Sequence, residues 1–225
     1  MKEENKLGKE LITIFWIFII GSIIGSIIET IVGILVDRHF HVRTGLIYGG
    51  FIPVYGVGAI MYYLVVRKMK DPAKVFLTTM ILGGLVEYMC SYVQEVFFGT
   101  ISWDYSHISF NLNGRTSLIH CVFWGILGIF FTVIAYPIIF KFLANYGKKE
   151  FKIITMIMII FMSVNIVLSC AAGSRQNERV QQIPADSAFD EFLDKYYPDK
   201  RMDRIYANKI VTVKRNSQNM SGESQ

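Results

Sequence analysis

Five apolar stretches, each about as long as a membrane is thick, constrain this chain more than any other feature. A helix needs about 20 mostly apolar residues to cross the hydrocarbon core of a bilayer. The stretches are Leu11–Val36, Ile47–Val66, Val75–Phe98, Leu118–Leu143 and Phe151–Ala172. Only helices and closed barrels satisfy their own backbone in lipid, and the alternating pattern of barrel strands does not occur here. The sequence therefore predicts an all-α, polytopic integral membrane bundle of about five transmembrane helices.

The second stretch is the least regular of the five. Gly49, Gly50, Pro53, Gly56 and Gly58 interrupt it. Within a membrane, non-helical backbone persists only where protein or a cavity covers it. Discontinuous helices at this depth often form the binding sites of transporters. We therefore expect a second helix broken by Gly and Pro; a kinked helix whose glycines serve close packing is the alternative.

Composition divides the chain into two parts. Overall, 52% of the residues are hydrophobic and 18% are charged, against about 25% charged in ordinary soluble domains. Residues 1–173 contain nearly all the apolar runs, whereas residues 174–225 resemble soluble sequence. This excludes a soluble enzyme with one compact core and predicts a transmembrane bundle followed by a small extramembrane tail.

The tail carries one short amphipathic pattern. Apolar residues recur at helical spacing over about residues 187–197, Ser187 is placed to cap this helix, and Pro198 follows it. Ile205 to Val213 is expected to be extended, and the last ten residues are expected to be disordered. A tail of this size favours a lid or interfacial element over a catalytic domain.

Basic residues orient the predicted spans, because cytoplasmic loops carry an excess of Lys and Arg. With the N-terminus inside, the outer loops near the spans carry Arg38, Arg43 and Arg115. The inner segments then carry Lys2, Lys6, Lys9, Arg67, Lys68, Lys70, Lys74, Lys141, Lys148, Lys149 and Lys152. We therefore expect the N-terminus in the cytoplasm and the tail outside, and the net charge of +5 suits an anionic lipid surface.

Carboxylates within the spans are the candidate functional groups. A charge at the centre of a membrane helix costs about 2.5 to 3.5 kcal/mol on insertion scales, so such residues usually face a bundle interior and have a partner. Glu87, Ser91 and Glu95 fall on one helix face, and Glu29 lies on a glycine-rich face of the first span. We expect these side chains and Tyr55 to converge on one interior site. A purely packing role for the carboxyl groups is the alternative.

The loop from Gly99 to Thr116 is dense in aromatic and polar residues. It contains Trp103, Asp104, Tyr105, Asn111 and Arg115, and Asn113-Gly114 is a turn signal. An aromatic belt at the membrane surface explains the rings, whereas a loop folded over the bundle explains the rings and the polar groups together. Asp104 and Arg115 are the expected ion pair.

The motifs together resemble a known family. They are Glu29-Thr30, Arg43-Thr44-Gly45, the run from Tyr48 to Gly56, Glu87-Tyr88 with Glu95, the run from Trp103 to Ser106, the run from Phe110 to Arg115, and Trp124-Gly125. Over about residues 12–205 they resemble the ABC-transporter type IV family, also called CmpB-like. The resemblance implies a bacterial, multi-pass permease of the cytoplasmic membrane. It also implies that any ATPase is a separate chain, because no Gly-x-x-x-x-Gly-Lys-Ser/Thr motif occurs here.

Three classes of function stay open at this point. The first is a permease-like protein whose polar site comprises the ten residues named above: Glu29, Tyr55, Glu87, Ser91, Glu95, Trp103, Asp104, Tyr105, Asn111 and Arg115. The second is a membrane enzyme acting on a lipid-linked or envelope substrate, with Glu95, Asp104 and His107 as acid–base candidates. The third is a structural or regulatory protein whose tail binds an envelope protein.

The residue pattern indicates few other partners. It predicts no metal site, no cofactor and no nucleic-acid surface, and Cys90, Cys121 and Cys170 are read as small apolar side chains. No nucleophile and base are spaced as in a known enzyme, so the pattern favours a non-enzymatic function. A homo-oligomer is compatible with the sequence.

Overall fold

The computed structural model describes residues 2–38, 40–206 and 209–211. In this part of the chain, four helical runs are long and apolar enough to cross a membrane. They are α1 (Lys2–Asp37), α3 (Pro72–Phe98), the continuous run Leu118–Leu143 and α6 (Lys149–Val180). The remaining apolar helix, α2 (Pro53–Val66), has 14 residues and covers roughly 21 Å, less than the roughly 30 Å of a bilayer core. The expected count of five spans stays a prediction, as does the break in the second.

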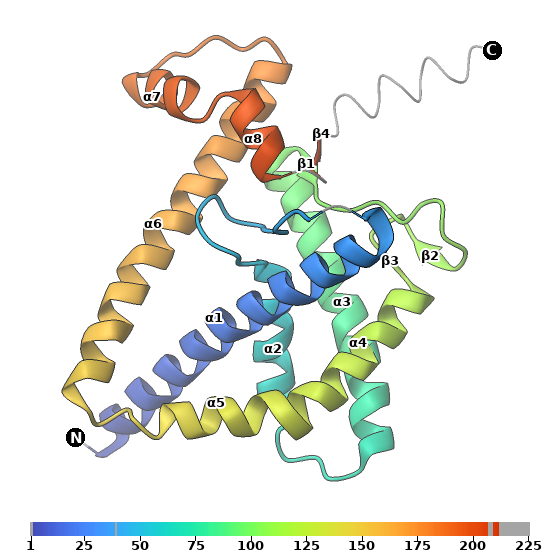
Figure 1. Cartoon of the computed structure of the whole chain (residues 1–225), viewed down its shortest axis with the longest axis vertical. Helices are drawn as coiled ribbons and strands as arrows, with labels where there is room; N and C mark the ends of the chain where they lie inside the picture. The colour runs from blue at the N-terminus through green and yellow to red at the C-terminus, as the bar shows by residue number, and fades with distance from the viewer. Residues whose placement is uncertain (1, 39, 207–208, 212–225) are drawn as a thin grey trace.

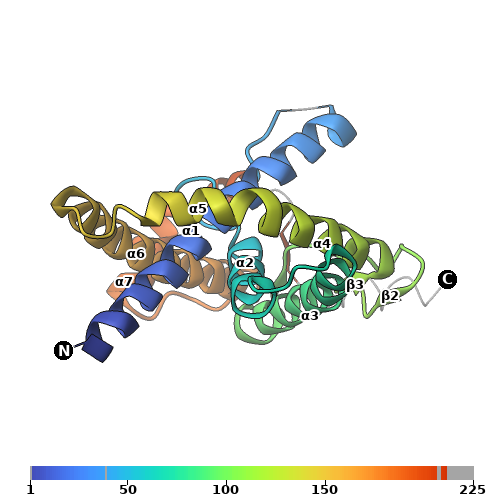
Figure 2. The ribbon, with the colours of Figure 1, turned by 90° about the horizontal axis from the view of Figure 1, so that it is seen from below.

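The helices run up and down between two ends of the molecule (Figure 1). The N-terminus and the links 67–71 and 144–148 lie at one end, which we call the N-terminal end. Residues 40–52, 99–117, 181–206 and 209–211 lie towards the other, which we call the loop-rich end. Seen from the N-terminal end, α6 lies on one side, α3 and α4 (Leu118–Phe130) lie on the other, and α1 and α2 lie between them (Figure 2).

The boundaries of α3 follow from its flanking residues. Asp71 accepts hydrogen bonds from the backbone N–H groups of Ala73 and Lys74, and Pro72 occupies the first helical position, where a missing N–H costs nothing. At the other end Gly99 has φ = 58°, a left-handed conformation that favours glycine. The loop of residues 99–117 therefore begins at a fixed residue, Gly99, at the end of α3.

A proline divides the run Leu118–Leu143 into α4 (Leu118–Phe130), a π-helical turn η1 (Phe131–Ala135) and α5 (Tyr136–Leu143). Pro137 has no N–H, and its ring crowds the carbonyl group of the residue four positions earlier. The N–H of Tyr136 donates to the carbonyl of Phe131, five residues back. The widened turn thus accommodates the proline without ending the helix.

Residues 40–52 lead into α2 and reach the central part of α6. The side chain of Asn165 bonds the backbone of Tyr48 at both its N–H and its carbonyl, and the Ser169 hydroxyl accepts from the N–H of Ile47 at 2.9 Å. On α1, the Ser26 hydroxyl donates to the carbonyl of Arg43 at 2.6 Å. Side chains on two spans thus satisfy backbone groups that lipid could not.

The tail packs on the loop-rich end of α6. Its helices are α7 (Ala188–Tyr196) and α8 (Asp199–Ile205), and its strand β4 (Ile210–Val211) pairs antiparallel with β1 (Thr100–Ile101). Leu193 and Met202, which are fully buried, pack in one cluster with Ala172 of α6. The described part of the tail is therefore folded against the bundle. The predicted disorder of the last ten residues lies outside the described residues.

Candidate functional site

Glu87 lies in the middle of α3 and is 5% exposed. Two hydroxyl groups hold its carboxyl: the Thr116 hydroxyl donates to Oε2 at 2.7 Å, and the Tyr105 hydroxyl donates to Oε1 at 3.1 Å. Both donors come from the loop above α3. The loop of residues 99–117 thus folds over the bundle and closes on the intramembrane carboxyl group.

The second carboxyl group, Glu29, is positioned by the glycine-rich face of α1. Gly25 lies against the ring of Tyr55 on α2, where any Cβ atom would overlap that ring. Because Glu29 follows Gly25 by four residues, it lies one turn along the same face. The Tyr55 hydroxyl donates to Oε1 of Glu29 at 2.8 Å. The close approach of α2 to α1 therefore decides which side chain reaches Glu29.

The two carboxyl groups belong to one electrostatic unit. Glu29 and Glu87 interact with each other, and Tyr55 interacts with both. Tyr105 also interacts with both, and burial raises the pKa of this loop residue far above its usual value. Its hydroxyl thus stays protonated and serves as a donor. We call Glu29, Tyr55, Glu87, Tyr105 and Thr116 the polar cluster.

A second group of predicted residues lies next to the polar cluster, along the same face of α3. Arg115 forms an ion pair with Glu95 and donates to the Ser91 hydroxyl at 3.3 Å. Its backbone carbonyl accepts from the indole N–H of Trp103 at 2.8 Å. Arg115, for which Asp104 was the expected partner, thus forms its ion pair with Glu95.

A short hairpin brings these residues to α3. Strands β2 (Asn111–Leu112) and β3 (Thr116–Ser117) pair antiparallel around Asn113 and Gly114, whose φ angles of 53° and 68° suit a tight hairpin turn. Arg115 and Thr116 are consecutive, and they reach Glu95 and Glu87 at the two ends of the stripe on α3.

The two other loop candidates have local bonds. Asp104 accepts from the N–H of Ser106 at 3.0 Å, and Asn111 accepts from the N–H of Gly114 at 2.9 Å. These bonds shape the hairpin that carries Arg115 and Thr116. Eight of the ten predicted residues therefore lie in the two groups around α3 and α1, whereas Asp104 and Asn111 build the loop that closes over them.

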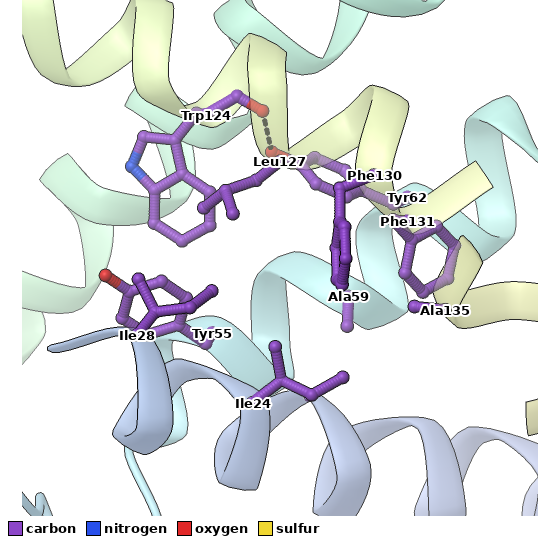
Figure 3. Close-up of a pocket in the computed structure, with 11 residues that line it drawn as sticks. Ile24, Ile28, Tyr55, Ala59, Tyr62, Trp124, Leu127, Phe130, Phe131 and Ala135 are labelled. Carbon is purple, nitrogen blue, oxygen red and sulfur yellow. Dashed lines mark hydrogen bonds between the residues drawn. The ribbon is translucent and has the colours of Figure 1, made fainter. Parts of the chain in front are cut away.

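A narrow apolar groove, partly open to the surroundings, adjoins the polar cluster. It lies between α1 and the α4–η1 run, with α2 behind it (Figure 3). The Tyr55 hydroxyl and the indole nitrogen of Trp124 are at one end, and Phe131 and Ala135 are at the other (Figure 3). The rings of Tyr55 and Trp124 have their centroids 5.2 Å apart. The groove thus has a polar end and a long apolar wall.

Residues 16–170 match the family model described as Putative ABC-transporter type IV. The chain belongs to this family. No curated protein and no solved structure matches the chain. The matched range contains α2, α3, the loop of residues 99–117 and both residue groups of the site. Membership in this family, together with the four apolar helices, fits a membrane transporter-like protein.

The sequence reading missed several residues that complete this family member's site. Thr116 donates to Glu87, Trp124 lines the groove, and His120 stacks on Tyr105 with ring centroids 3.7 Å apart. Thr116 and His120 follow the Asn113-Gly114 turn. A hairpin around this turn brings the residues after it back towards α3, so the turn was a signal for both. Asn165, which holds the backbone of Tyr48, is a polar amide within an apolar run, and such a residue indicates a hydrogen bond between elements.

Proposed function

We propose that this protein is a permease-like membrane component in which Glu29 and Glu87 bind a solute within the bilayer. The observation that carries the proposal is the setting of Glu87. It is 5% exposed in the middle of a candidate span, and its donors are hydroxyls of a loop that folds over it. Intramembrane carboxyl groups of this kind usually mark solute, ion or proton pathways.

The loop of residues 99–117 supplies the gate in this proposal. Tyr105 and Thr116 release Glu87 when the loop lifts, while Arg115 pairs with Glu95 at the entrance. Three hydroxyl bonds, including that of Tyr55 to Glu29, hold the carboxyl groups, and each net bond of this kind contributes about 0.5 to 3 kcal/mol. Breaking these bonds costs a free energy that thermal motion and solute binding together can supply, so the loop can open.

We further propose that the N-terminal end faces the cytoplasm of a bacterial cell. The basic residues Lys68, Lys70 and Lys148 lie in the links at that end. A separate ATPase, which the family's description suggests, would also bind there. A stable interface of standard size covers about 800 Å² on each partner, and the two links comprise five residues each. The two links are too short to form such an interface alone, so an ATPase would also have to bind the ends of the helices. The proposal therefore concerns passage of a solute through the bundle.

The test is the accessibility of a cysteine at Ser91 from each side of the membrane. Ser91 lies one turn from Glu87 and is 1% exposed, so reaction of Ser91→Cys with a thiol reagent reports opening of the bundle. Thiols react as thiolates, which require water. The background carries replacements of Cys90, Cys121 and Cys170, and Val93→Cys, on the exposed side of α3, is the matched control.

A permease site is expected to react from both sides. A membrane-impermeant maleimide should label Ser91→Cys in intact cells and in inside-out vesicles, and should label Val93→Cys in neither. Labelling from one side alone would mean a dead-end vestibule, and labelling from neither side would mean that the carboxyl groups only pack helices. Either result overturns the proposal.

A further inference from the structure

Helix α7 exposes a stack of three aromatic rings. Phe189, Phe192 and Tyr196 follow one another at spacings of three and four residues, so they share one face of the helix. The ring centroids of Phe189 and Phe192 are 6.1 Å apart, and those of Phe192 and Tyr196 are 4.9 Å apart. The three side chains are 52%, 41% and 48% exposed, in chain order. A contiguous apolar face that stays exposed marks a contact with a membrane or a protein.

The end of the apolar part of α6 sets the level of α7 relative to the membrane. The chain carries no charged residue between Lys152 and Arg175, and Ala172 ends the apolar stretch. At about 1.5 Å per residue, Arg175 and Arg179 lie roughly 5 Å and 10 Å beyond Ala172, which is the depth range of the polar headgroups. Because Asp194 of α7 accepts hydrogen bonds from both arginines, α7 lies at the level of the headgroups.

The contacts between the two helices indicate which way the aromatic face points. Asp194 reaches the arginines beyond the apolar stretch of α6, whereas Leu193 packs in one cluster with Ala172 at the end of that stretch. At about 100° per residue, Phe192 and Tyr196 each lie about 160° around the helix from Asp194. The aromatic face therefore points away from the arginines and towards the bilayer.

The aromatic face also continues an exposed apolar surface of α6. Leu168 packs against the cluster that contains Leu193. Val164 lies one turn before Leu168 on the same face of α6, within the apolar stretch, and is 60% exposed. A surface of this kind on a membrane-spanning helix faces lipid, so the lipid surface of α6 extends to the side of α7 that carries the rings.

The residues of α7 indicate how it would bind a lipid surface. Aromatic rings, and tyrosine with its polar tip above all, are enriched where a membrane meets water. Lys195 is the only basic residue in Ala188–Tyr196, and the acidic Glu191 is exposed beside it on the side away from the rings. Without a basic cluster, attraction to the membrane comes from the rings and does not require anionic lipid.

We propose that α7 is an interfacial helix whose Phe189, Phe192 and Tyr196 insert into the lipid leaflet at the loop-rich end of the bundle. The partner of this face is the boundary between headgroups and acyl chains. The inference goes beyond the permease proposal and does not depend on it, because it concerns how the tail is held. The hydroxyls of Tyr197 and Tyr48 share a hydrogen bond of 2.8 Å, so insertion of α7 would also fix the tail against the segment that leads into α2.

The experiment is quenching of a bimane fluorophore by brominated phosphatidylcholine, with the purified full chain in nanodiscs. The background carries replacements of the three native cysteines. Bimane is attached to Phe192→Cys on the aromatic face, or to Glu191→Cys, the adjacent exposed position outside that face. Tyr196→Cys is a second site on the aromatic face, and it keeps both phenylalanines.

Fluorescence at Phe192→Cys and Tyr196→Cys should fall when brominated lipid replaces ordinary phosphatidylcholine, because bromine quenches only at short range. Fluorescence at Glu191→Cys should stay unchanged, and added phosphatidylglycerol should alter neither result. A second measurement needs no label. The double variant Phe189→Gln with Phe192→Gln should lower the hydrogen-exchange protection of α7 amides in nanodiscs, whereas Glu191→Gln, the matched control, should not.

Three outcomes would overturn the inference. Unquenched fluorescence at both aromatic sites, or unchanged protection in the double variant, would mean that the rings do not enter the lipid. Equal quenching at Glu191→Cys would mean that the helix does not present its aromatic face to the bilayer. Quenching that requires phosphatidylglycerol would mean that charge, and not the rings, brings the tail to the membrane.

Discussion

Asn165 of α6 and Tyr48, in the segment that leads into α2, are joined by two hydrogen bonds between the side-chain amide and the Tyr48 backbone. The amide Nδ2 donates to the carbonyl of Tyr48 at 2.7 Å, and the N–H of Tyr48 donates to Oδ1 at 3.1 Å. Asn165 is 1% exposed and lies in the apolar part of α6. Replacing it with Leu should therefore leave two backbone groups unpaired, each at a cost of about 1–3 kcal/mol.

The measurement is the thermal unfolding midpoint of Asn165→Leu in detergent micelles. The control is Val164→Leu, an exposed neighbour on the same helix that should change the midpoint little. An unchanged midpoint for Asn165→Leu would show that the amide does not hold the loop.

Gly25 should tolerate no side chain. The Cβ atom of Gly25→Ala would overlap the Tyr55 ring, and overpacking of this kind costs about 1–3 kcal/mol. Because Tyr55 would move away from Glu29, the free energy of unfolding should fall by this amount. Gly173→Ala, in α6, is the matched control, since nothing lies within 4 Å of that Cβ position. It should be neutral or should stabilise the helix by up to about 1 kcal/mol. Equal effects in the two variants would contradict the assigned packing.

Docking of the tail should depend on pH through Asp194. The Arg175 guanidinium, which is 3% exposed, donates to both carboxylate oxygens at 3.0 Å and 2.9 Å, and Arg179 donates to Oδ1 at 2.6 Å. These bonds, those of Arg175 above all, hold the pKa of Asp194 below its usual 3.8. A lowered pKa contributes stability that is complete above about pH 5 and is lost as the pH falls through 3.8 and below.

The measurement is the hydrogen-exchange protection of α7 amides between pH 7 and pH 3. Protection in the wild type should fall across the acid part of this range. Asp194→Asn should be less protected at pH 7 and should show a flatter profile. Glu191→Gln, an exposed carboxyl on the same helix, should behave as the wild type does. A wild-type profile in Asp194→Asn would rule out this ion pair as the source of the pH dependence.

The two ends of the molecule should lie on opposite sides of the membrane. In the background without native cysteines, Ser109→Cys at the loop-rich end and Lys70→Cys at the N-terminal end are both exposed. An impermeant maleimide should label Ser109→Cys in intact cells, and should label Lys70→Cys only after the cells are permeabilised. The reverse pattern would mean that the loop-rich end faces the cytoplasm.

Much of the bundle could be predicted from residue type and spacing. The apolar runs indicate α1, α3, the run Leu118–Leu143 and α6. Lipid offers no hydrogen-bond partners, and a helix satisfies its own backbone groups. Glu87, Ser91 and Glu95 share a face through helical periodicity, and Gly21 and Gly25 mark where another helix can approach. These are local properties, and a single sequence contains them.

Pairings across long stretches of chain were decided by the tertiary structure. Periodicity indicates that Glu87 faces inward, but it does not say that Thr116 and Tyr105 come from a folded-back loop to meet it. Arg115 pairs with Glu95 because the hairpin turn directs its side chain along α3. The clamp between Asn165 and Tyr48 joins residues 117 positions apart. Residue spacing determines which face of a helix a side chain occupies, whereas its partner depends on how the faces of different elements pack.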